Sequence, residues 1–474
     1  MRSLEIALLI TLGCDILIRM TGIRSLWRWS ILLPILGLFL VGLQLLVEGY
    51  RWQMIPAYTL AVFLAGATLL LLRDYDTLPL LSYQRGWVLV SGVLALLVLA
   101  VGTFLPLVLP VPQPPTPTGI FAVGTTTRHL TDTSRNETYS DNPDDPRELI
   151  VQFWYPAEPE SGTGPAPYLN RVDVIGPALA EGVALPSFLL DHLRLAQTQS
   201  ISEAAVVSGS VSFPVILISH GWTSIRSMHT SLAQELASQG YIVAAIDHTY
   251  GAAVAVFPDD RVIYANEEAL PSDVPDDEFQ HAANTLATVW AADIRFVFDH
   301  LQILRDGDDL FRERIDLEQI GVFGHSTGGA ATLEACAVDK RCRVALLADG
   351  WFVPVSEAVL DNGIEQALMF MRSEVWSKEA NDKLYKRLRA GHGAAATEIT
   401  ILGTEHYDFT DTGLLSPLAP ALGLRKGPID ASRGIEIINT YATAFFDSYL
   451  KNIPSPLLVG ATERFPEVVF GTSD

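Results

Sequence analysis

The sequence predicts an α/β protein whose mostly parallel sheet has helices on both faces, preceded by a transmembrane helical region. Two observations lead to this prediction. Predicted strands alternate with predicted helices through the second half of the chain, which is typical of parallel sheets. Long apolar runs fill residues 1–110, and 49% of the 474 residues are hydrophobic. That fraction is too high for an ordinary soluble enzyme, so a membrane part is expected.

Four apolar runs begin the chain, at Leu4–Ile18, Trp29–Val47, Met54–Leu72 and Trp87–Leu109. The last three are long enough to cross a hydrocarbon core of about 30 Å. The first is shorter and contains Glu5 and Asp15, so whether it spans is left open. Tryptophans lie near the ends of the runs, as interfacial anchors do: Trp27, Trp29, Trp52 and Trp87. About four transmembrane helices are therefore expected to hold the chain in a lipid bilayer.

Arginines between the apolar runs predict the orientation. The first loop contains Arg19, Arg24 and Arg28, the third is flanked by Arg73 and Arg85, and the second has only Arg51. Cytoplasmic loops of membrane proteins are enriched in Lys and Arg, so the first and third loops are expected in the cytoplasm. The chain would then be an integral plasma-membrane protein whose second half lies on the extracytoplasmic side.

A proline-rich stretch separates the two halves. Its prolines predict a stiff, extended spacer and are Pro106, Pro110, Pro112, Pro114, Pro115 and Pro117. The predicted organisation is a membrane region at residues 1–110, a linker at 111–118 and one globular domain at 119–474, which is long enough for a large core.

The globular half shows a regular alternation of elements. Apolar or β-branched runs predict strands at Arg147–Tyr155, Phe213–Ser219, Tyr241–Ile246, Ile320–Phe323, Arg343–Ala348, Ala367–Met371 and Glu398–Leu402. Helical spacing predicts helices at Ser227–Gln239, Ala282–Leu304, around Lys378–Leu388 and at Ile435–Leu450. The acidic, turn-rich segment Val254–Phe279 is expected to be a surface excursion. Reactive residues are expected at the C-terminal ends of the strands.

One of these strand-to-helix turns contains a chemical motif, Gly-His-Ser-Thr-Gly, in which Ser326 lies between Gly324 and Gly328. This is the nucleophile-elbow pattern G-x-S-x-G. The turn is sharp, and side chains at the two glycines would collide with the neighbouring strand and helix. Ser326 is expected to be strained and exposed, above a helix N-terminus that favours negative charge.

Two further residues complete a catalytic arrangement in the order Ser326, Asp349, His406. This is the chain order of the α/β-hydrolase fold. His406 would take the proton of the serine hydroxyl, and Asp349 would orient the imidazole and stabilise its charged form. The backbone N–H groups of Thr327 and Trp222 would bind the oxyanion.

Alternatives stand beside these assignments. Many proteins with this fold place the acid one strand later, where Glu374 lies. Three more histidines follow strands or end them: His220, His248 and His325. His325 is expected to point away from the site, and His220 to shape the oxyanion turn. Near His406, Asp408 and Asp411 are expected to be loop or surface residues.

Charge and cysteine content exclude other classes. A formal net charge of −22 argues against nucleic-acid binding and against a polybasic lipid-binding patch. Three cysteines are too few for a disulfide scaffold or a zinc cluster. Cys336 and Cys342 are near enough in sequence to pair in an oxidising compartment, although two unpaired core thiols fit equally well.

Four segments of the second half also resemble a known family. They are Val151–Pro156, Ser219–Trp222, Gly324–Gly329 together with Ala348–Trp351, and Gly403–Asp411. Through them the chain resembles the secreted-type platelet-activating-factor acetylhydrolases, the calcium-independent group VII phospholipase A2 enzymes. The resemblance implies hydrolysis of short or oxidised sn-2 acyl chains of phospholipids, with neither a metal nor a cofactor expected. The chain departs from the family in its membrane region and in Thr327, where the family often has Phe.

The functional expectation is a membrane-anchored serine ester hydrolase acting on short or oxidised acyl esters. Two alternatives are kept. One is a general carboxylesterase similar to dienelactone or polyester hydrolases. The other is a catalytically dead membrane scaffold of the same fold, against which the intact set of Ser326, Asp349 and His406 argues.

Overall fold

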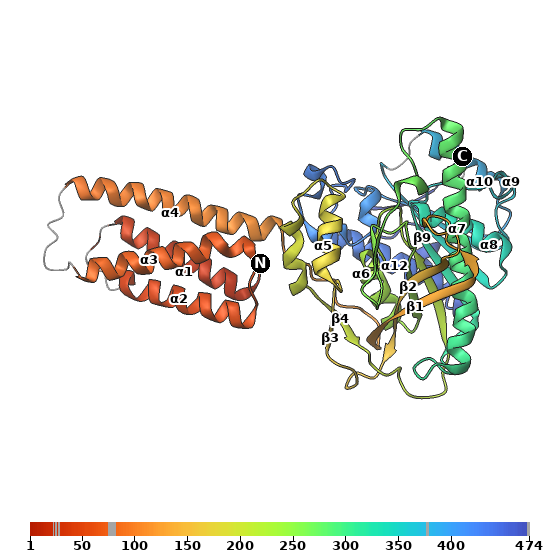
Figure 1. Ribbon diagram of the computed structural model, residues 1–474, viewed down its shortest axis with the longest axis horizontal. Coiled ribbons are helices and arrows are strands. Elements are labelled where there is room, and N and C mark those ends of the chain that lie inside the picture. Colours follow the sequence, from red (N-terminus) through yellow and green to blue (C-terminus); the bar gives the residue numbers. More distant parts are fainter. Residues whose placement is uncertain (22, 24–25, 27–28, 74–81, 376–378, 472–474) are drawn as a thin grey trace. The chain divides into compact units, whose positions relative to one another are not determined.

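The computed structural model describes residues 1–21, 23, 26, 29–73, 82–375 and 379–471. The chain divides into two compact units (Figure 1). The first comprises Met1–Pro112 with the short segments Asp191–Ala196 and Leu415–Leu418, and the second comprises Gln113–Leu190, Gln197–Leu414 and Ala419–Asp474. Each unit has its own apolar core.

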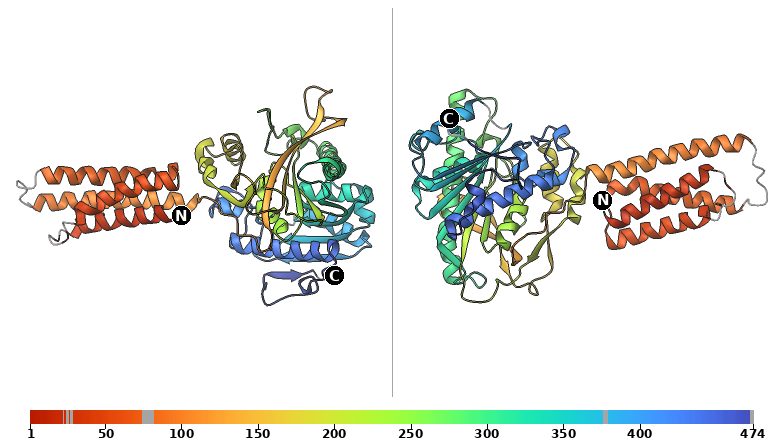
Figure 2. Two further views of the ribbon diagram at one scale, coloured as in Figure 1. Left: turned by 90° about the horizontal axis from the view of Figure 1, so that it is seen from below. Right: turned by 180° about the vertical axis from the view of Figure 1, so that it is seen from behind.

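Long helices make up the first unit: α1 (Ser3–Thr21), α2 (Trp29–Val47), α3 (Ile55–Arg73) and α4 (Ser82–Val108). They lie side by side (Figure 2) around a core that includes Leu8, Leu12, Ala57 and Leu60. Among the residues that the structure describes, three stretches are long and apolar enough to cross a membrane, at Trp29–Val47, Trp52–Leu70 and Gly86–Val108. Pro106, expected in the extended spacer, lies instead inside α4, in its last turn.

The carboxylates of α1 are buried in this bundle beside arginines. Glu5 lies 3.3 Å from the guanidinium of Arg51, and Asp15 lies 2.9 Å from Arg19 one turn along the helix. Burying a charge is costly unless it is paired, and these pairs reduce that cost. Part of the orientation argument rests on Arg24 and Arg28, which lie outside the described residues, as does Trp27.

A single large sheet organises the second unit, with strand order β13-β12-β11-β10-β9-β5-β6-β2-β1-β4-β3. From β6 through β5, β9, β10 and β11 to β12 the neighbours are parallel, whereas β2 pairs antiparallel with β6 and with β1. The strands are β1 (Ala122–Asn136), β2 (Pro146–Ala157), β3 (Pro165–Pro167), β4 (Gln197–Ser202), β5 (Phe213–Ser219), β6 (Ile242–Asp247), β9 (Ile315–His325), β10 (Cys342–Ala348), β11 (Ala367–Ser373), β12 (Ala396–Ile401) and β13 (Val468–Phe470).

Helices cover both faces of this sheet, as the sequence predicts. Alternate residues of β5 point into two separate cores: Val215 and Leu217 into one, Ile216 and Ile218 into the other. The first core is closed by α7 (Asp276–Gly307), α8 (Thr327–Val338), α9 (Glu357–Asn362) and α10 (Glu379–Gly391), and the second by α6 (Thr230–Ser238) and α12 (Ala431–Leu450). Because a strand exposes successive side chains to opposite faces, continuous apolar runs are required here.

One prediction for this unit needs correction, and one long strand was not predicted. The segment Val254–Phe279 is not only a surface excursion, because β7 (Val254–Val256) and β8 (Val262–Tyr264) form a hairpin within it, Phe257 is buried, and α7 already begins at Asp276. The long strand β1 was missed because its sequence is rich in Thr and charged residues and has no apolar run.

A disulfide joins Cys336 to Cys342, between the end of α8 and the start of β10.

Candidate active site

The predicted nucleophile elbow lies in a strained turn between β9 and α8. Ser326 has φ 55°, a backbone conformation that costs a residue with a side chain about 1–3 kcal/mol. A Cβ added at Gly324 would lie 2.4 Å from the carbonyl oxygen of Gly328, and one at Gly328 would lie 2.2 Å from that of Ser219. Only glycine therefore fits at these two positions. Ser326 is less open than expected, since it is only 9% exposed.

Asp349 and His406 are brought together from two different loops. Asp349 directly follows β10, and His406 begins a short 3-10 turn, η6 (His406–Phe409), after β12. The two atoms His406 Nδ1 and Asp349 Oδ2 are 2.8 Å apart. Ser326 lies at the end of the strand next to β10, and its backbone N–H donates to the carbonyl of Ala348, 3.1 Å away. The three predicted residues thus lie at adjoining positions at one edge of the sheet.

The acid is held by its own hydrogen bonds. Asp349 accepts from the backbone N–H of Ser373 at 2.8 Å and from the Ser373 hydroxyl at 3.0 Å, besides His406. Its φ of 47° is a second strained conformation in the site. Glu374, the alternative acid, instead accepts from the backbone N–H of Gly403 at 2.6 Å.

Burial changes the proton affinities of both partners. Burial raises the pKa of Asp349 to about 7, opposed by the two hydrogen bonds from Ser373. Burial, and then the positive charge of Arg425, lowers the pKa of His406 to about 3. The imidazole is therefore neutral near pH 7. With Nδ1–H donated to Asp349, the basic nitrogen of that tautomer is Nε2, which is the form that a general base requires.

The predicted oxyanion turn packs against Ser326. It follows β5 as His220, Gly221 and Trp222. A Cβ added at Gly221 would lie 3.0 Å from Ser326 Cβ and 3.5 Å from Ser326 Oγ. Thr327 is the first residue of α8, and the first N–H groups of a helix have no partner within it. Trp222 directly follows Gly221 and Thr327 directly follows Ser326, so the two predicted oxyanion donors lie next to the close approach of Gly221 to Ser326.

His325 was expected to point away from the site, and this was wrong. Its Nε2 donates to the backbone carbonyl of His406 at 3.0 Å, and the two imidazole rings have centroids 4.7 Å apart. Burial lowers the pKa of His325 well below its usual value, so the ring is neutral. The histidine inside the elbow therefore supports the loop that carries His406.

Asp408 and Asp411 are loop residues, but neither is on the surface. Asp408 accepts from the backbone N–H groups of Glu405 and Gly427, at 2.9 and 2.6 Å. Asp411 accepts from the backbone N–H of Ser231 and from the hydroxyl of Tyr168, both at 3.1 Å. Both carboxylates fix the course of the chain after His406. Sequence reasoning missed this role because each partner lies in another segment.

Comparison with known proteins gives the site a context. Residues 114–287 and 296–453 match the family described as platelet-activating factor acetylhydrolase, isoform II. This chain belongs to that family. The matched ranges include Trp222, Ser326, Thr327, Asp349 and His406, and they begin after α4.

Individual relatives agree with this family. A platelet-activating factor acetylhydrolase of Canis lupus familiaris is 30% identical over 256 residues, which is 50% of this chain and 57% of that protein. Its counterpart in Gallus gallus is 27% identical, over 52% of this chain and 64% of that protein. The chain thus spans about three-fifths of the length of these relatives.

Two further matches cover more of the globular half. A probable 1-alkyl-2-acetylglycerophosphocholine esterase of Arthroderma benhamiae is 26% identical over 75% of this chain and 93% of that protein. The solved structure of a ferulic acid esterase from Streptomyces cinnamoneus is similar with a TM-score of 0.64 and 28% identity, over 76% of this chain and 100% of that one. Both are named as esterases.

Proposed function

We propose that this member of the acetylhydrolase family is a serine ester hydrolase in which Ser326 is the nucleophile, His406 the general base and Asp349 its orienting acid. The observation that carries the proposal is the 2.8 Å bond between His406 Nδ1 and Asp349 Oδ2, at strand ends next to a strained Ser326. A strained backbone conformation persists only where the surrounding structure holds it in place, and such conformations cluster at active sites.

The reaction would proceed through an acyl-enzyme. The Ser326 hydroxyl loses its proton to His406 Nε2 as its oxygen bonds to the ester carbonyl carbon. His406 then returns that proton to the leaving alkoxide as the ester C–O bond breaks. Water repeats the sequence, giving up a proton to His406 and releasing the carboxylic acid and free Ser326. Asp349 stabilises the imidazolium in both halves of the reaction.

The oxyanion of each tetrahedral intermediate would be bound by the backbone N–H groups of Trp222 and Thr327. Such donors act in the transition state, and losing one costs about 10²- to 10³-fold in kcat in related chemistry. The close contact of Gly221 with Ser326 supports this placement.

The substrate class we favour is a short-chain acyl ester of a phospholipid. This rests on the names of the relatives, platelet-activating factor acetylhydrolase and 1-alkyl-2-acetylglycerophosphocholine esterase. A second candidate is a general carboxylester hydrolase, favoured by the similarity to a ferulic acid esterase over the whole of that chain.

A substrate panel separates these candidates. Full-length chain in detergent is assayed with a 2-acetyl phosphocholine, p-nitrophenyl butyrate and methyl ferulate, each beside Ser326→Ala. We expect all measurable activity to require Ser326 and the acetyl phospholipid to give the highest kcat/KM. Preference for methyl ferulate would favour the second candidate. Equal rates for wild type and Ser326→Ala would refute the mechanism.

We also propose that the first unit anchors the enzyme in the plasma membrane with the globular half outside the cytoplasm. The apolar stretches and the arginine-rich loops support this. The Cys336–Cys342 disulfide supports it independently, because disulfides persist in oxidising compartments. Protease added to intact cells should remove the globular half, and its protection until the cells are lysed would reverse the orientation.

A further inference from the structure

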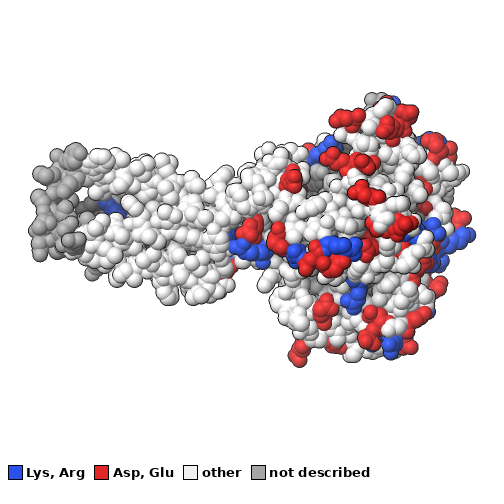
Figure 3. Space-filling view, viewed as in Figure 1, with Lys and Arg blue, Asp and Glu red and all other residues white. Residues whose placement is uncertain are grey.

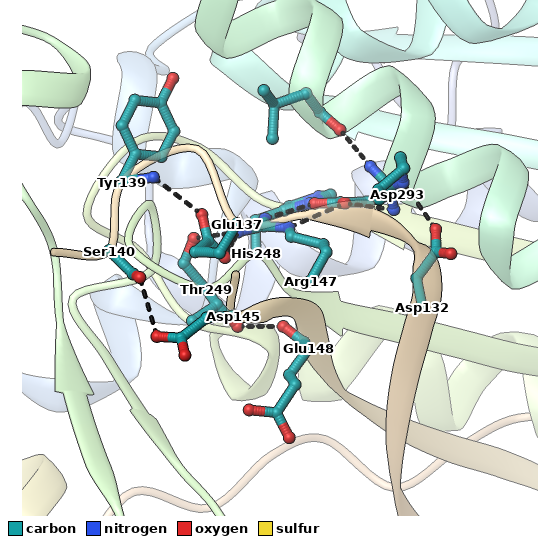
Figure 4. A network of polar contacts seen from close by, with 12 residues as sticks. Asp132, Glu137, Tyr139, Ser140, Asp145, Arg147, Glu148, His248, Thr249 and Asp293 are labelled. Carbon is teal, nitrogen blue, oxygen red and sulfur yellow. Dashed lines mark hydrogen bonds and ion pairs between the residues drawn. The ribbon is translucent and has the colours of Figure 1, made fainter. Parts of the chain in front are cut away.

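A buried ionic network lies inside the second unit and contains none of Ser326, Asp349 and His406 (Figure 4). Arg147 of β2 donates to both oxygens of Asp293 in α7, at 3.0 and 2.6 Å, and to Glu137 at 2.7 Å. Arg147 is 1% exposed and Asp293 is 0% exposed. Although burial opposes it, the charge of Arg147 and the hydrogen bond from His248 hold the pKa of Asp293 below its usual value. Asp293 is thus a fixed carboxylate.

Asp293 sets the tautomer of His248, the residue that follows β6. Asp293 Oδ2 is 2.9 Å from His248 Nδ1, and the ring stacks on Trp290 with centroids 4.2 Å apart. Burial lowers the pKa of His248, so the ring is neutral and Nδ1 carries its proton. Nε2 then accepts from the hydroxyl of Ser219, 2.9 Å away. Ser219, His248 and Asp293 are all 0% exposed, so this Ser-His-Asp set cannot meet an ester.

The same loop acts on His220, the first residue of the oxyanion turn. The backbone N–H of His248 donates to His220 Nε2 at 3.4 Å, and His220 Nδ1 lies 2.7 Å from the carbonyl oxygen of Gly221. A proton on His220 Nε2 would need an acceptor, and Asp247 Oδ1 is 4.0 Å away. That oxygen already accepts a hydrogen bond from the backbone N–H of Arg226. The proton of His220 is therefore on Nδ1, donated to Gly221.

The Gly221 carbonyl shares a rigid plane with the N–H of Trp222. The peptide group is planar, so fixing its C=O also fixes the direction of its N–H. Gly221 O accepts from His220 Nδ1 at 2.7 Å and from the backbone N–H of Ser224 at 3.1 Å. These two bonds determine where the Trp222 N–H points, beside Ser326.

We propose that His220 is a positioning residue that aims the Trp222 N–H at the oxyanion. The backbone N–H of His248 keeps the proton of His220 on Nδ1, and Arg147 and Asp293 hold the His248 side chain in place. This rests on the proposed function. Asp293 falls between the two ranges matched by the family, 114–287 and 296–453. Because the donor acts on the oxyanion and not on the ground-state ester, its misalignment lowers kcat and leaves KM largely unchanged.

Three variants of the full-length chain test the proposal. His220→Leu removes the donor. In His220→Asn the side-chain amide nitrogen takes the place of Nδ1, so the donor to Gly221 O is kept. In His220→Gln the amide nitrogen takes the place of Nε2, out of reach of Gly221 O, so the donor is lost. For p-nitrophenyl butyrate we expect kcat to fall about 10- to 100-fold in the Leu and Gln variants with little change in KM, and to recover in the Asn variant. Affinity for an alkyl trifluoromethyl ketone, whose hemiketal oxyanion occupies the same site, should fall in step with kcat/KM.

The test includes a matched control variant and results that would refute the proposal. His392 is also a buried histidine, placed against Gly363, and His392→Leu should leave kcat unchanged. Equal kcat in the Asn and Gln variants, or wild-type kcat in both, would overturn the positioning role, and this comparison holds even if His220→Leu does not fold. If activity depends on Ser326 but is unaffected by the His220 variants, only the positioning role of His220 is refuted. Activity that survives Ser326→Ala refutes the proposed function with it.

Discussion

At the scale of single residues, the candidate site contains two strained positions, Ser326 and Asp349, and the second is hydrogen-bonded to His406. Positive φ at both costs folding free energy, and the hydrogen bonds from Ser373 and His406 hold Asp349 in place. If Asp349 orients the imidazole, an isosteric amide there presents the wrong hydrogen-bonding group to Nδ1.

Asp349→Asn should therefore lower kcat by about 10³- to 10⁴-fold, because the favoured tautomer of His406 would be reversed. The measurement is the steady-state hydrolysis of p-nitrophenyl butyrate. Glu374→Gln is the control, since that carboxylate bonds to the backbone of Gly403, and its kcat should stay close to wild type. The opposite ranking would move the acid to Glu374.

The pH profile should report the burial of His406. Burial lowers the pKa of His406 to about 3, below the ordinary histidine value of 6.5, so protonation of His406 should lower kcat/KM only well below pH 6.5. Burial raises the pKa of Asp349 to about 7, so a separate limb near pH 7 should report the loss of that carboxylate's charge. Arg425→Gln removes a nearby positive charge that disfavours the imidazolium. The pKa of His406 should rise, and its limb of kcat/KM should move to higher pH. A limb that shifts with Arg425→Gln but lies at or above pH 6.5 in the wild type would contradict this.

At the scale of elements, the elbow depends on close backbone approach between β9, α8 and the turn after β5. The strands around it could be predicted because apolar runs buried on both faces are distinctive, and Ser326, Asp349 and His406 each follow such a run closely. The network from Arg147 through Asp293 to His248 could not be predicted. Its members lie in β2, in the middle of α7 and after β6, and only the folded sheet brings them together.

Gly324→Ala should destabilise the fold and abolish activity, since its Cβ would meet the Gly328 carbonyl at 2.4 Å. Overpacking of this kind costs about 1–3 kcal/mol in the free energy of unfolding, and more where backbone has to move. Gly307→Ala, at the end of α7 with open space around it, is the matched control. Urea unfolding compares the two, and equal stability would show that the elbow tolerates a side chain.

At the scale of the whole molecule, charge is distributed unevenly along the chain. The net charge is −22, and Figure 3 shows Asp and Glu spread over the visible face of the globular unit, with few charged residues on the described helices of the first unit. An acidic catalytic half should be repelled by an anionic lipid surface, and salt should screen that repulsion.

Hydrolysis of a 2-acetyl phosphocholine presented in vesicles should depend on vesicle charge accordingly. At low ionic strength kcat/KM should be lower in vesicles containing anionic lipid than in purely zwitterionic ones, and the difference should shrink as salt is added. Rates that are independent of vesicle charge at low salt would argue against an electrostatic effect of the acidic surface.

The identity of the nucleophile is the central claim, and covalent labelling tests it most directly. The full-length chain is treated with a fluorophosphonate and digested, and the modified peptide is sequenced by mass spectrometry. The account predicts one phosphonylated residue, Ser326, with loss of ester hydrolysis in proportion to labelling and no adduct in Ser326→Ala. An active preparation that is labelled at another residue, or not at all, would contradict it.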